Sequence, residues 1–269
     1  MTRLTLLLAA FALALTATTA QARMMGDDKD VARMVSFGGS CAKCELSGKK
    51  LTGARFIGAN FTNSALVGAD LRGATFMGAN FVAADLTRAD LRSASMMGAN
   101  FASAVFIDAQ LDGIEAAGVN FKGADLTKAV LTGAELPGSN LAGATLTRAN
   151  FSGADMPAAN LSNADAARAD FSDADLAAAN LAYGSFVRAS FRDADLRGAV
   201  LARGDFTGAD FRGASLHKTT ISGANLAGAR GLTQEQVNQA CGDSSTSLPK
   251  GLSVKSCRSI VIIKRIAAY

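Results

Sequence analysis

A five-residue frame runs without interruption from Cys44 to Gly228, and it constrains the fold more than any other feature of the chain. If the apolar centre of each unit is position i, Leu or Phe fills it in 32 of 37 units, Ala stands at i−2 in 28 and Gly at i+2 in 19. A period of five fits neither a helix of 3.6 residues per turn nor the two-residue alternation of a strand. The chain must therefore turn every five residues. Glycine at i+2 supplies the positive φ that tight turns need, and Pro137 and Pro157 stand at i+1, where a fixed φ suits a turn.

A second period, of twenty residues, lies inside the first. Asn recurs at i−1 every twenty residues from Asn60 to Asn180, and Phe recurs in two sets with the same spacing. The two Phe sets are Phe61, Phe81, Phe101 and Phe121, and Phe151, Phe171, Phe191 and Phe211. Four units per coil turn each set into a ladder, with Asn amides bonded between coils and Phe rings stacked along the core. The sequence predicts a four-sided all-β coil.

The same frame predicts how the core is filled. The i residue points inward from each side and the small i−2 residue fills the space near the corner, over about nine coils. Ala116 is a small centre, but Ile114 and Val119 are large at i−2, a swap that roughly conserves volume. Ala166 has no such compensation, so we expect a local void or a dented side there.

Units such as Ala69-Asp70-Leu71-Arg72-Gly73 and Ala194-Asp195-Leu196-Arg197-Gly198 resemble those of the pentapeptide-repeat family over about two thirds of the chain. The resemblance implies a right-handed quadrilateral β-helix. It implies little about function, because most members have none assigned, although some mimic B-form DNA and protect or inhibit topoisomerase.

The first 22 residues are typical of a secretory signal peptide. Arg3 gives a positive start, Leu4 to Leu15 is an apolar run too short to span a membrane comfortably, and Ala20-Gln21-Ala22 is a small-x-small cleavage site. We expect a periplasmic or secreted protein with no transmembrane segment after cleavage near Ala22. Residues 23–43 then form an N-terminal linker and cap, residues 44–228 the β-helix, and residues 229–269 a C-terminal cap.

Four cysteines flank the repeat. Cys41 and Cys44 form a CxxC pair that favours a small disulfide over two thiols, zinc or redox chemistry; a c-type haem site would need His where Glu45 stands. Cys241 and Cys257 enclose a loop of fifteen residues and are expected to pair in an oxidising compartment, with intermolecular pairing or free thiols as the alternatives. A helix followed by such a loop is similar to the tails of secreted members of the family.

The C-terminal segment carries a helix start signal. Thr233-Gln234-Glu235-Gln236 is a capping box, and it predicts a short helix to about Ala240 that lays Val237 and Ala240 over the last coil. Ile260 to Ile263 is a β-prone run that pairs with the last coil or is otherwise a liability for self-association.

Binding signals must sit at the outward positions i+1 and i+2. One corner column carries five cations, interrupted at Asp108: Arg88, Lys128, Arg148, Arg168 and Arg188. Four arginines share the next side: Arg72, Arg92, Arg192 and Arg212. Nearby acids are placed to relieve the repulsion among the cations of both columns: Asp90, Asp170, Asp173 and Asp193. The plain interpretation is a solvated corner; the sharper one is a stripe that binds lipid phosphates, lipopolysaccharide or another acidic envelope polymer.

These features predict a non-catalytic scaffold or interaction protein of the bacterial cell envelope, monomeric or dimeric, with no cofactor or metal. His217 stands alone, and the many glycines are repeat corners rather than phosphate loops. A DNA mimic that binds topoisomerase is the alternative, disfavoured by the signal peptide and by the net charge of +4. No nucleic-acid partner is expected, and the protein or anionic partner stays unidentified at this level.

Overall fold

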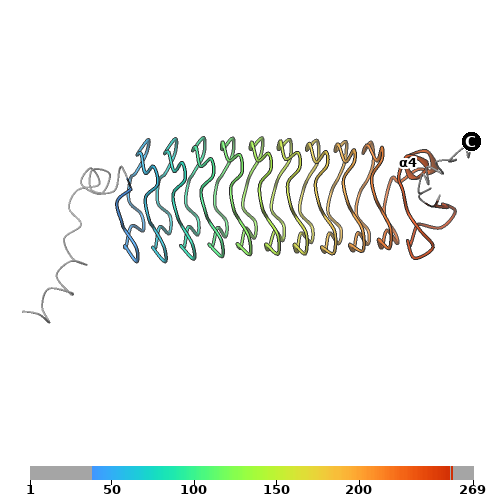
Figure 1. The fold of residues 1–269 in the computed structure, drawn as a ribbon, viewed down its shortest axis with the longest axis horizontal. Helices are drawn as coiled ribbons and strands as arrows, with labels where there is room; N and C mark the ends of the chain where they lie inside the picture. The colour runs from blue at the N-terminus through green and yellow to red at the C-terminus, as the bar shows by residue number, and fades with distance from the viewer. Residues whose placement is uncertain (1–37, 255, 257–269) are drawn as a thin grey trace, which may run out of the picture.

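Residues 38–254 and 256 are described by the structure, a computed structural model, and they form a straight rod of stacked coils (Figure 1). Parallel β-bridges join residues twenty apart in four columns, which start at Ser40, Glu45, Lys50 and Arg55. Each bridge is a single residue at position i−1, so the sides of the rod are far shorter than ordinary strands. The predicted four-sided β-helix is confirmed. Its right-handedness stays a prediction.

Backbone hydrogen bonds run along the rod between successive coils. The Phe61 N–H donates to the Asn80 carbonyl at 2.7 Å, and the Asn80 N–H donates back to the Ala59 carbonyl at 2.8 Å. A turn bond closes each corner, as where the Ala69 N–H donates to the Leu66 carbonyl at 3.0 Å. The backbone between corners is thus paired both upward and downward, which a buried core of this shape requires.

Every corner places its i+2 residue at positive φ, whether or not that residue is glycine. Gly133 has φ +61°, and Asn63, Arg148 and Tyr183 have φ 55°, 59° and 61°. The prediction that the chain turns at i+2 in a left-handed conformation is confirmed. Its generality was not predicted, because only about half of the units have glycine there.

Phenylalanine stacks fill the core as predicted. The rings of Phe61 and Phe81 lie 4.6 Å apart at 9°, and those of Phe151 and Phe171 lie 5.1 Å apart at 9°. Rings from neighbouring sides meet edge to face, as Phe56 does with Phe61 at 5.0 Å and 85°. Such aromatic pairs add to the stabilisation from burial alone.

Small residues fill the space that the rings leave. Alanine at i−2 is buried at every unit that carries it from Ala59 onward. Ala116 is fully buried together with Ile114 and Val119, as the predicted exchange of volume requires. Ala166 is fully buried as well, and the void expected beside it stays a prediction.

The Asn column forms the predicted ladder over most of its length. The Asn120 side-chain amide donates to the Asn100 Oδ1 at 2.9 Å, and the pattern continues through Asn140 and Asn160 to Asn180. Near the N-terminal end the Asn80 amide donates instead to the Thr62 hydroxyl at 3.1 Å. The Asn Oδ1 atoms also accept the backbone N–H of i+1, the local bond that favours Asn and Asp at turns.

At the N-terminal end the coil begins before Cys44, the predicted first residue. Ser40 pairs with Asn60, and Cys41 is buried below Phe61 in the centre position. Cys41 and Cys44 form a disulfide with a Cα–Cα distance of 5.2 Å. The bond therefore closes one corner of the first described coil. The predicted signal peptide lies outside the described residues.

At the C-terminal end a short helix, α4 (Gln234–Gln239), covers the last coil (Figure 1). Thr233 is its N-cap in the predicted capping box, and Val237 and Ala240 are buried. The Gln236 amide also donates to the carbonyls of Phe211 and Ala214 at 2.9 and 2.8 Å. The helix thus satisfies carbonyls that the next coil would otherwise bind.

Beyond α4 the chain rejoins two columns, because Thr220 pairs with Cys241 and Asn225 with Ser247. Gly242 pairs with Ser256, which brings together the chain segments next to Cys241 and Cys257. Cys257 and the run from Ile260 to Ile263 lie outside the described residues, so the predicted second disulfide and tail pairing stay predictions. Over the described part of the chain, no helix has the length and apolar character that crossing a membrane requires.

Candidate functional site: the charged columns of the rod

The corner column, defined as Arg88, Lys128, Arg148, Arg168 and Arg188, lines one edge of the rod. Its residues are all exposed and all have positive φ, between 56° and 60°. Successive coils of a β-ladder are about 4.8 Å apart, so Lys128 to Arg188 are four consecutive cations at that spacing along the backbone. Within residues 38–254 none of the five makes an ion pair. The column is a line of positive charge without ion pairs, interrupted by Asp108 between Arg88 and Lys128.

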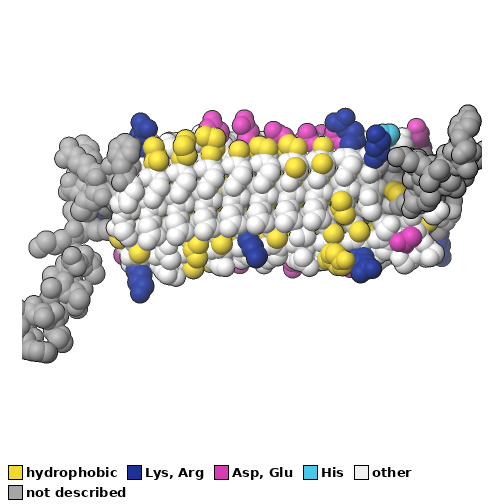
Figure 2. All heavy atoms as spheres, viewed as in Figure 1, with side chains coloured by type: hydrophobic (Ala, Val, Ile, Leu, Met, Phe, Trp, Pro, Cys, Tyr) yellow, Lys and Arg dark blue, Asp and Glu magenta, His cyan; other side chains and the backbone are white. Residues whose placement is uncertain are grey.

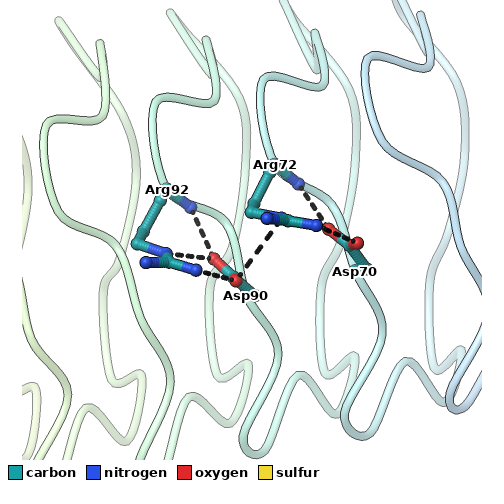
Figure 3. A network of polar contacts seen from close by, with 4 residues as sticks. All are labelled: Asp70, Arg72, Asp90 and Arg92. Atoms are coloured by element: carbon teal, nitrogen blue, oxygen red, sulfur yellow. Dashed lines mark hydrogen bonds and ion pairs between the residues drawn. The ribbon is translucent and has the colours of Figure 1, made fainter.

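The predicted relief of repulsion by neighbouring acids is confirmed for Asp90 on the adjacent side, and it is not found for the corner column. The Asp90 carboxylate instead accepts from Arg92 at 2.7 Å and lies 3.6 Å from Arg72 (Figure 3). Asp170 accepts from the Ser172 N–H and hydroxyl at 3.0 and 2.6 Å. The cause is local: a side chain at i−1 points toward i+1 of its own side, and not across the corner.

Most arginines on the adjacent side are held by carboxylates, while Arg192 of that side makes no ion pair within residues 38–254. Arg72 donates to Asp70 through Nε and Nη2 at 2.8 and 2.7 Å, and Arg92 does the same to Asp90 one coil further (Figure 3). The hydrogen bond from Arg72 lowers the pKa of Asp70 well below its usual range, and Arg92 lowers the pKa of Asp90. These cations are committed to carboxylates within the rod.

A third such group stabilises the C-terminal end. The Asp210 side chain is only 3% exposed and accepts from Arg212, with Arg230 3.7 Å away. The hydrogen bond from Arg212 lowers the pKa of Asp210, while burial opposes that shift. Because the Asp210–Arg230 bridge is the last of its column, this ion group fixes the final pairing of that side.

Sequence reasoning missed two further rows that share one side of the rod. The acidic row is Glu115, Glu135, Asp155 and Asp175, which pair backbone to backbone in consecutive coils. The apolar row occupies i+1 of the same side: Ile57, Met77, Met97, Ala117, Pro137, Pro157 and Ala177. Both rows could be read from the sequence by writing it in lines of twenty.

No arrangement for covalent chemistry is found in the described residues. His217 is exposed, and no three His, Cys, Asp or Glu side chains between residues 38 and 254 are grouped to hold a metal ion. What the columns can do is bind charged surfaces along the rod axis. Between Cys44 and Gly228 there are 16 Lys and Arg against 18 Asp and Glu, so the excess positive charge of the chain lies outside the repeat.

The fold and its outward columns define a solenoid of the β-helix class, built to present rows of identical or similar side chains. The family model for pentapeptide repeats matches eight copies, which together span residues 40–228. The chain belongs to the pentapeptide-repeat family.

Among solved structures, HetL from the cyanobacterium Nostoc sp. strain PCC 7120, a pentapeptide repeat protein involved in heterocyst differentiation regulation, is 28% identical. The match covers 77% of this chain and 91% of HetL, with a TM-score of 0.59. QnrB1, a plasmid-mediated fluoroquinolone resistance protein, is 20% identical over 77% of this chain and 94% of QnrB1, with a TM-score of 0.39. No curated protein matches the chain.

Proposed function

We propose that the protein is an exported, non-catalytic scaffold of the bacterial cell envelope that binds an anionic polymer or lipid surface through the corner column. The observation that carries this proposal is the placement of five exposed cations without ion pairs on one edge of the rod, whereas four arginines elsewhere on the repeat are held by carboxylates: Arg72, Arg92, Arg197 and Arg212. A line of charge that is free of counter-charges is the simplest electrostatic recognition element for a polyanion.

The backbone supports this interpretation. A non-glycine residue in the left-handed region costs about 1–2 kcal/mol, and glycine stands at that place in 19 units of the repeat. Arg or Lys nevertheless occupies five corners of this column, while Lys43, Arg203 and Lys218 are the cations at the i+2 corners of other sides. Cations concentrated at strained positions on one edge favour a role in binding over a general role in solubility.

Membership in the pentapeptide-repeat family and the likeness to HetL, a protein involved in the regulation of heterocyst differentiation, favour a partner-binding role over catalysis. Export rests on the sequence of residues 1–22. Mimicry of DNA is not favoured, because the carboxylates of the rod are interleaved with nearly as many cations between Cys44 and Gly228.

The test is retention on immobilised heparin and on acidic liposomes. We expect the triple variant Arg148→Glu, Arg168→Glu, Arg188→Glu to lose retention. The matched control is Lys122→Glu, Arg192→Glu, Lys218→Glu, which makes the same change in net charge at exposed residues of other sides and should keep most of it. If both variants lose retention equally, the loss reflects net charge alone and the corner column is not a binding site.

A further inference from the structure

A second surface, independent of the corner column, lies on the side of the rod that carries the acidic row and the apolar row. A line of hydrophobic side chains runs along one edge of the rod with acidic side chains next to it (Figure 2). The two rows belong to the same side, at i−1 and i+1, so they lie roughly 6.6 Å apart across the side. This side is therefore amphipathic along its length.

Three of the four carboxylates of this row have no structural task in the described part of the chain. Elsewhere in the repeat, Asp and Asn at i−1 accept the backbone N–H of i+1, and Asp175 does so from Ala177 at 2.8 Å. Asp155 cannot, because Pro157 has no N–H to donate. Glu135 precedes Pro137 in the same way, and Glu115 is likewise without a hydrogen bond or ion pair among residues 38–254.

These three side chains are also unshielded. Glu115, Glu135 and Asp155 are exposed, and each stands directly above the next in the ladder. Arg197, a cation of the same side, lies beyond the end of the row, where it donates to Asp195. Stacked like charges without counter-charges oppose folding, so the row is unfavourable for the isolated rod.

The apolar row on this side is unusual because it exposes large hydrophobic side chains. Met77 and Met97 are 42% and 38% exposed, and they are two of the three large hydrophobic side chains that the described residues expose. Ile57 extends the row toward the N-terminal end, while the rest of the row gives a low surface beside the carboxylates: Ala117, Pro137, Pro157 and Ala177. Exposed methionines are common on surfaces that accept partners of varied shape.

The spacing of the rows selects the shape of the partner. From Glu115 to Asp175 there are three coil steps, or about 14 Å. Basic residues at i, i+3, i+7 and i+10 of an α-helix span about 15 Å along its axis. Same-face residues of an extended strand span about 20 Å over three steps, which does not match.

We propose that this side of the rod docks a basic amphipathic α-helix of a partner protein, laid along the rod axis. Its Lys or Arg edge lies on Glu115, Glu135, Asp155 and Asp175, and its apolar edge lies on the row from Met77 to Ala177. The proposal goes beyond the binding of anions and does not depend on it, because it uses a different side and the opposite charge.

The probe is a synthetic helical peptide with Lys at the i, i+3, i+7, i+10 positions and Leu along the adjacent edge. A second peptide of the same composition, reordered to break that alignment, is the control. We expect fluorescence anisotropy at low salt to show binding of the aligned peptide at least tenfold tighter than that of the reordered one. Equal binding of the two peptides would overturn the proposal.

The protein variants locate the site. Glu115→Gln, Glu135→Gln, Asp155→Asn removes three charges that make no bond, and we expect at least tenfold weaker binding of the aligned peptide. The control is Asp85→Asn, Asp125→Asn, Asp165→Asn, which removes the same charge from another side while each new amide oxygen still accepts its backbone N–H. Binding that falls equally in both variants would overturn the proposal.

Met77→Thr with Met97→Thr tests the apolar row, using a residue found at i+1 on other sides, and should weaken binding about threefold or more. Unchanged binding in this variant would contradict the use of both rows. Sedimentation of the protein alone tests whether a second copy of this chain binds to this side of the rod instead. Self-association that is lost in the acidic-row variant would assign this side to a second copy and overturn the proposal. Retention on heparin should not fall in the acidic-row variant, which removes only negative charges, and this separates the test of the acidic row from that of the corner column.

Discussion

Replacing the arginines of the corner column by glycine should stabilise the rod. The variant is Arg148→Gly, Arg168→Gly, Arg188→Gly, in which three residues at φ 59°, 60° and 58° are exchanged for the residue that adopts this conformation without strain. The left-handed conformation costs a non-glycine residue about 1–2 kcal/mol, and the greater freedom of glycine in the unfolded chain offsets roughly 0.5–1 kcal/mol of the gain. The expected net gain is about 0.5 kcal/mol per corner, or about 1.5 kcal/mol in all.

Loss of charge repulsion adds a second contribution to the stabilisation expected of the glycine variant, and this contribution depends on salt. Two unit charges about 4.8 Å apart in water repel by roughly 0.9 kcal/mol before screening, and the variant removes three neighbouring pairs, counting the one with Lys128. Long side chains that diverge into solvent reduce this value, so it is an upper bound. At 1 M salt the Debye length is about 3 Å and the repulsion is largely screened.

A companion variant separates the two parts. Arg148→Gln, Arg168→Gln, Arg188→Gln removes the charges but keeps non-glycine residues at the strained corners. Because the chain has no Trp, urea unfolding is followed by far-ultraviolet circular dichroism, with m-values compared to check that the transition is unchanged in kind. The glycine variant should exceed the glutamine variant by about 1.5 kcal/mol at every salt concentration, and the glutamine variant should exceed the parent only at low salt.

If the glycine and glutamine variants unfold at the same urea concentration, the corners carry no strain and the expected gain from glycine is refuted. A glycine variant that is less stable than the parent would show that the arginine stems stabilise the rod by packing on it. Either result would remove the argument that the corner column is kept at a cost in stability.

Three further perturbations test the packing and the ion groups. Ser139→Ala should raise stability by about 1 kcal/mol in thermal unfolding, because the buried Ser139 hydroxyl has no hydrogen-bond partner within residues 38–254. Ser64→Ala should lower stability by a similar amount through loss of the bond from the Ser64 hydroxyl to the Phe61 carbonyl at 2.6 Å. A loss of stability in Ser139→Ala would contradict the assignment of an unsatisfied hydroxyl. Gly204→Ala should cost about 1–3 kcal/mol, although alanine is the usual residue at i−2, because the added Cβ would lie 2.7 Å from the Phe206 ring. The same substitution in a Phe206→Leu background should cost less. A Gly204→Ala variant as stable as the parent would disprove the clash. Asp210→Asn should cost about 1–2 kcal/mol at pH 7. Because the folded-state pKa of Asp210 is lowered, the difference in stability from the parent should shrink as the pH falls below about 4. A difference that does not change at all between pH 7 and pH 2 would point to packing and not to charge.

The fold could be predicted because the repeat states the same constraint many times. One Phe at an inward position says little, but Phe61 and Phe81 at the same point of successive coils require a stack, and the rings lie 4.6 Å apart. The helix after the repeat was equally clear, because Thr233 and Gln236 are two halves of one local hydrogen-bonding motif.

The charge pairing could not be predicted from spacing alone. Arg88 and Asp90 are two residues apart, as are Asp90 and Arg92, but only the second pair forms. The difference lies in the corner: the positive φ of Arg88 turns its side chain away from the side on which Asp90 lies. The twenty-residue period therefore predicts which residues are neighbours along the rod. Predicting which side chains pair across a corner requires the backbone coordinates.

Glycines at i−2 show the same limit in the core. Gly184 and Gly204 interrupt an alanine column and by frame alone count as weak positions. In the structure each is followed two residues later by a phenylalanine whose ring occupies the place of the missing Cβ, at 2.6 Å for Phe186 and 2.7 Å for Phe206. The exchange of volume between i−2 and i was predicted for Ala116, which is small at i and has the large Ile114 at i−2. The two glycines show the opposite exchange, with the smallest residue at i−2 and a large ring at i.

A repeat fold separates what the backbone requires from what it merely allows. Most units carry Asp or Asn at i−1, Gly at i+2 and Ala at i−2, which suit the turn and the core, but units such as that of Val105 form the same turn without a side-chain acceptor at i−1. The corner column carries Arg or Lys in place of glycine at i+2, and the carboxylates of Glu135 and Asp155 precede prolines that have no i+1 N–H to donate. Both features, the cations at i+2 of the corner column and the carboxylates before prolines, recur over consecutive coils of the rod. A single chance substitution would not recur in this way. In the two proposals a separate binding surface relieves each set of like charges, because the corner column and the acidic row carry opposite charges and one partner surface does not complement both.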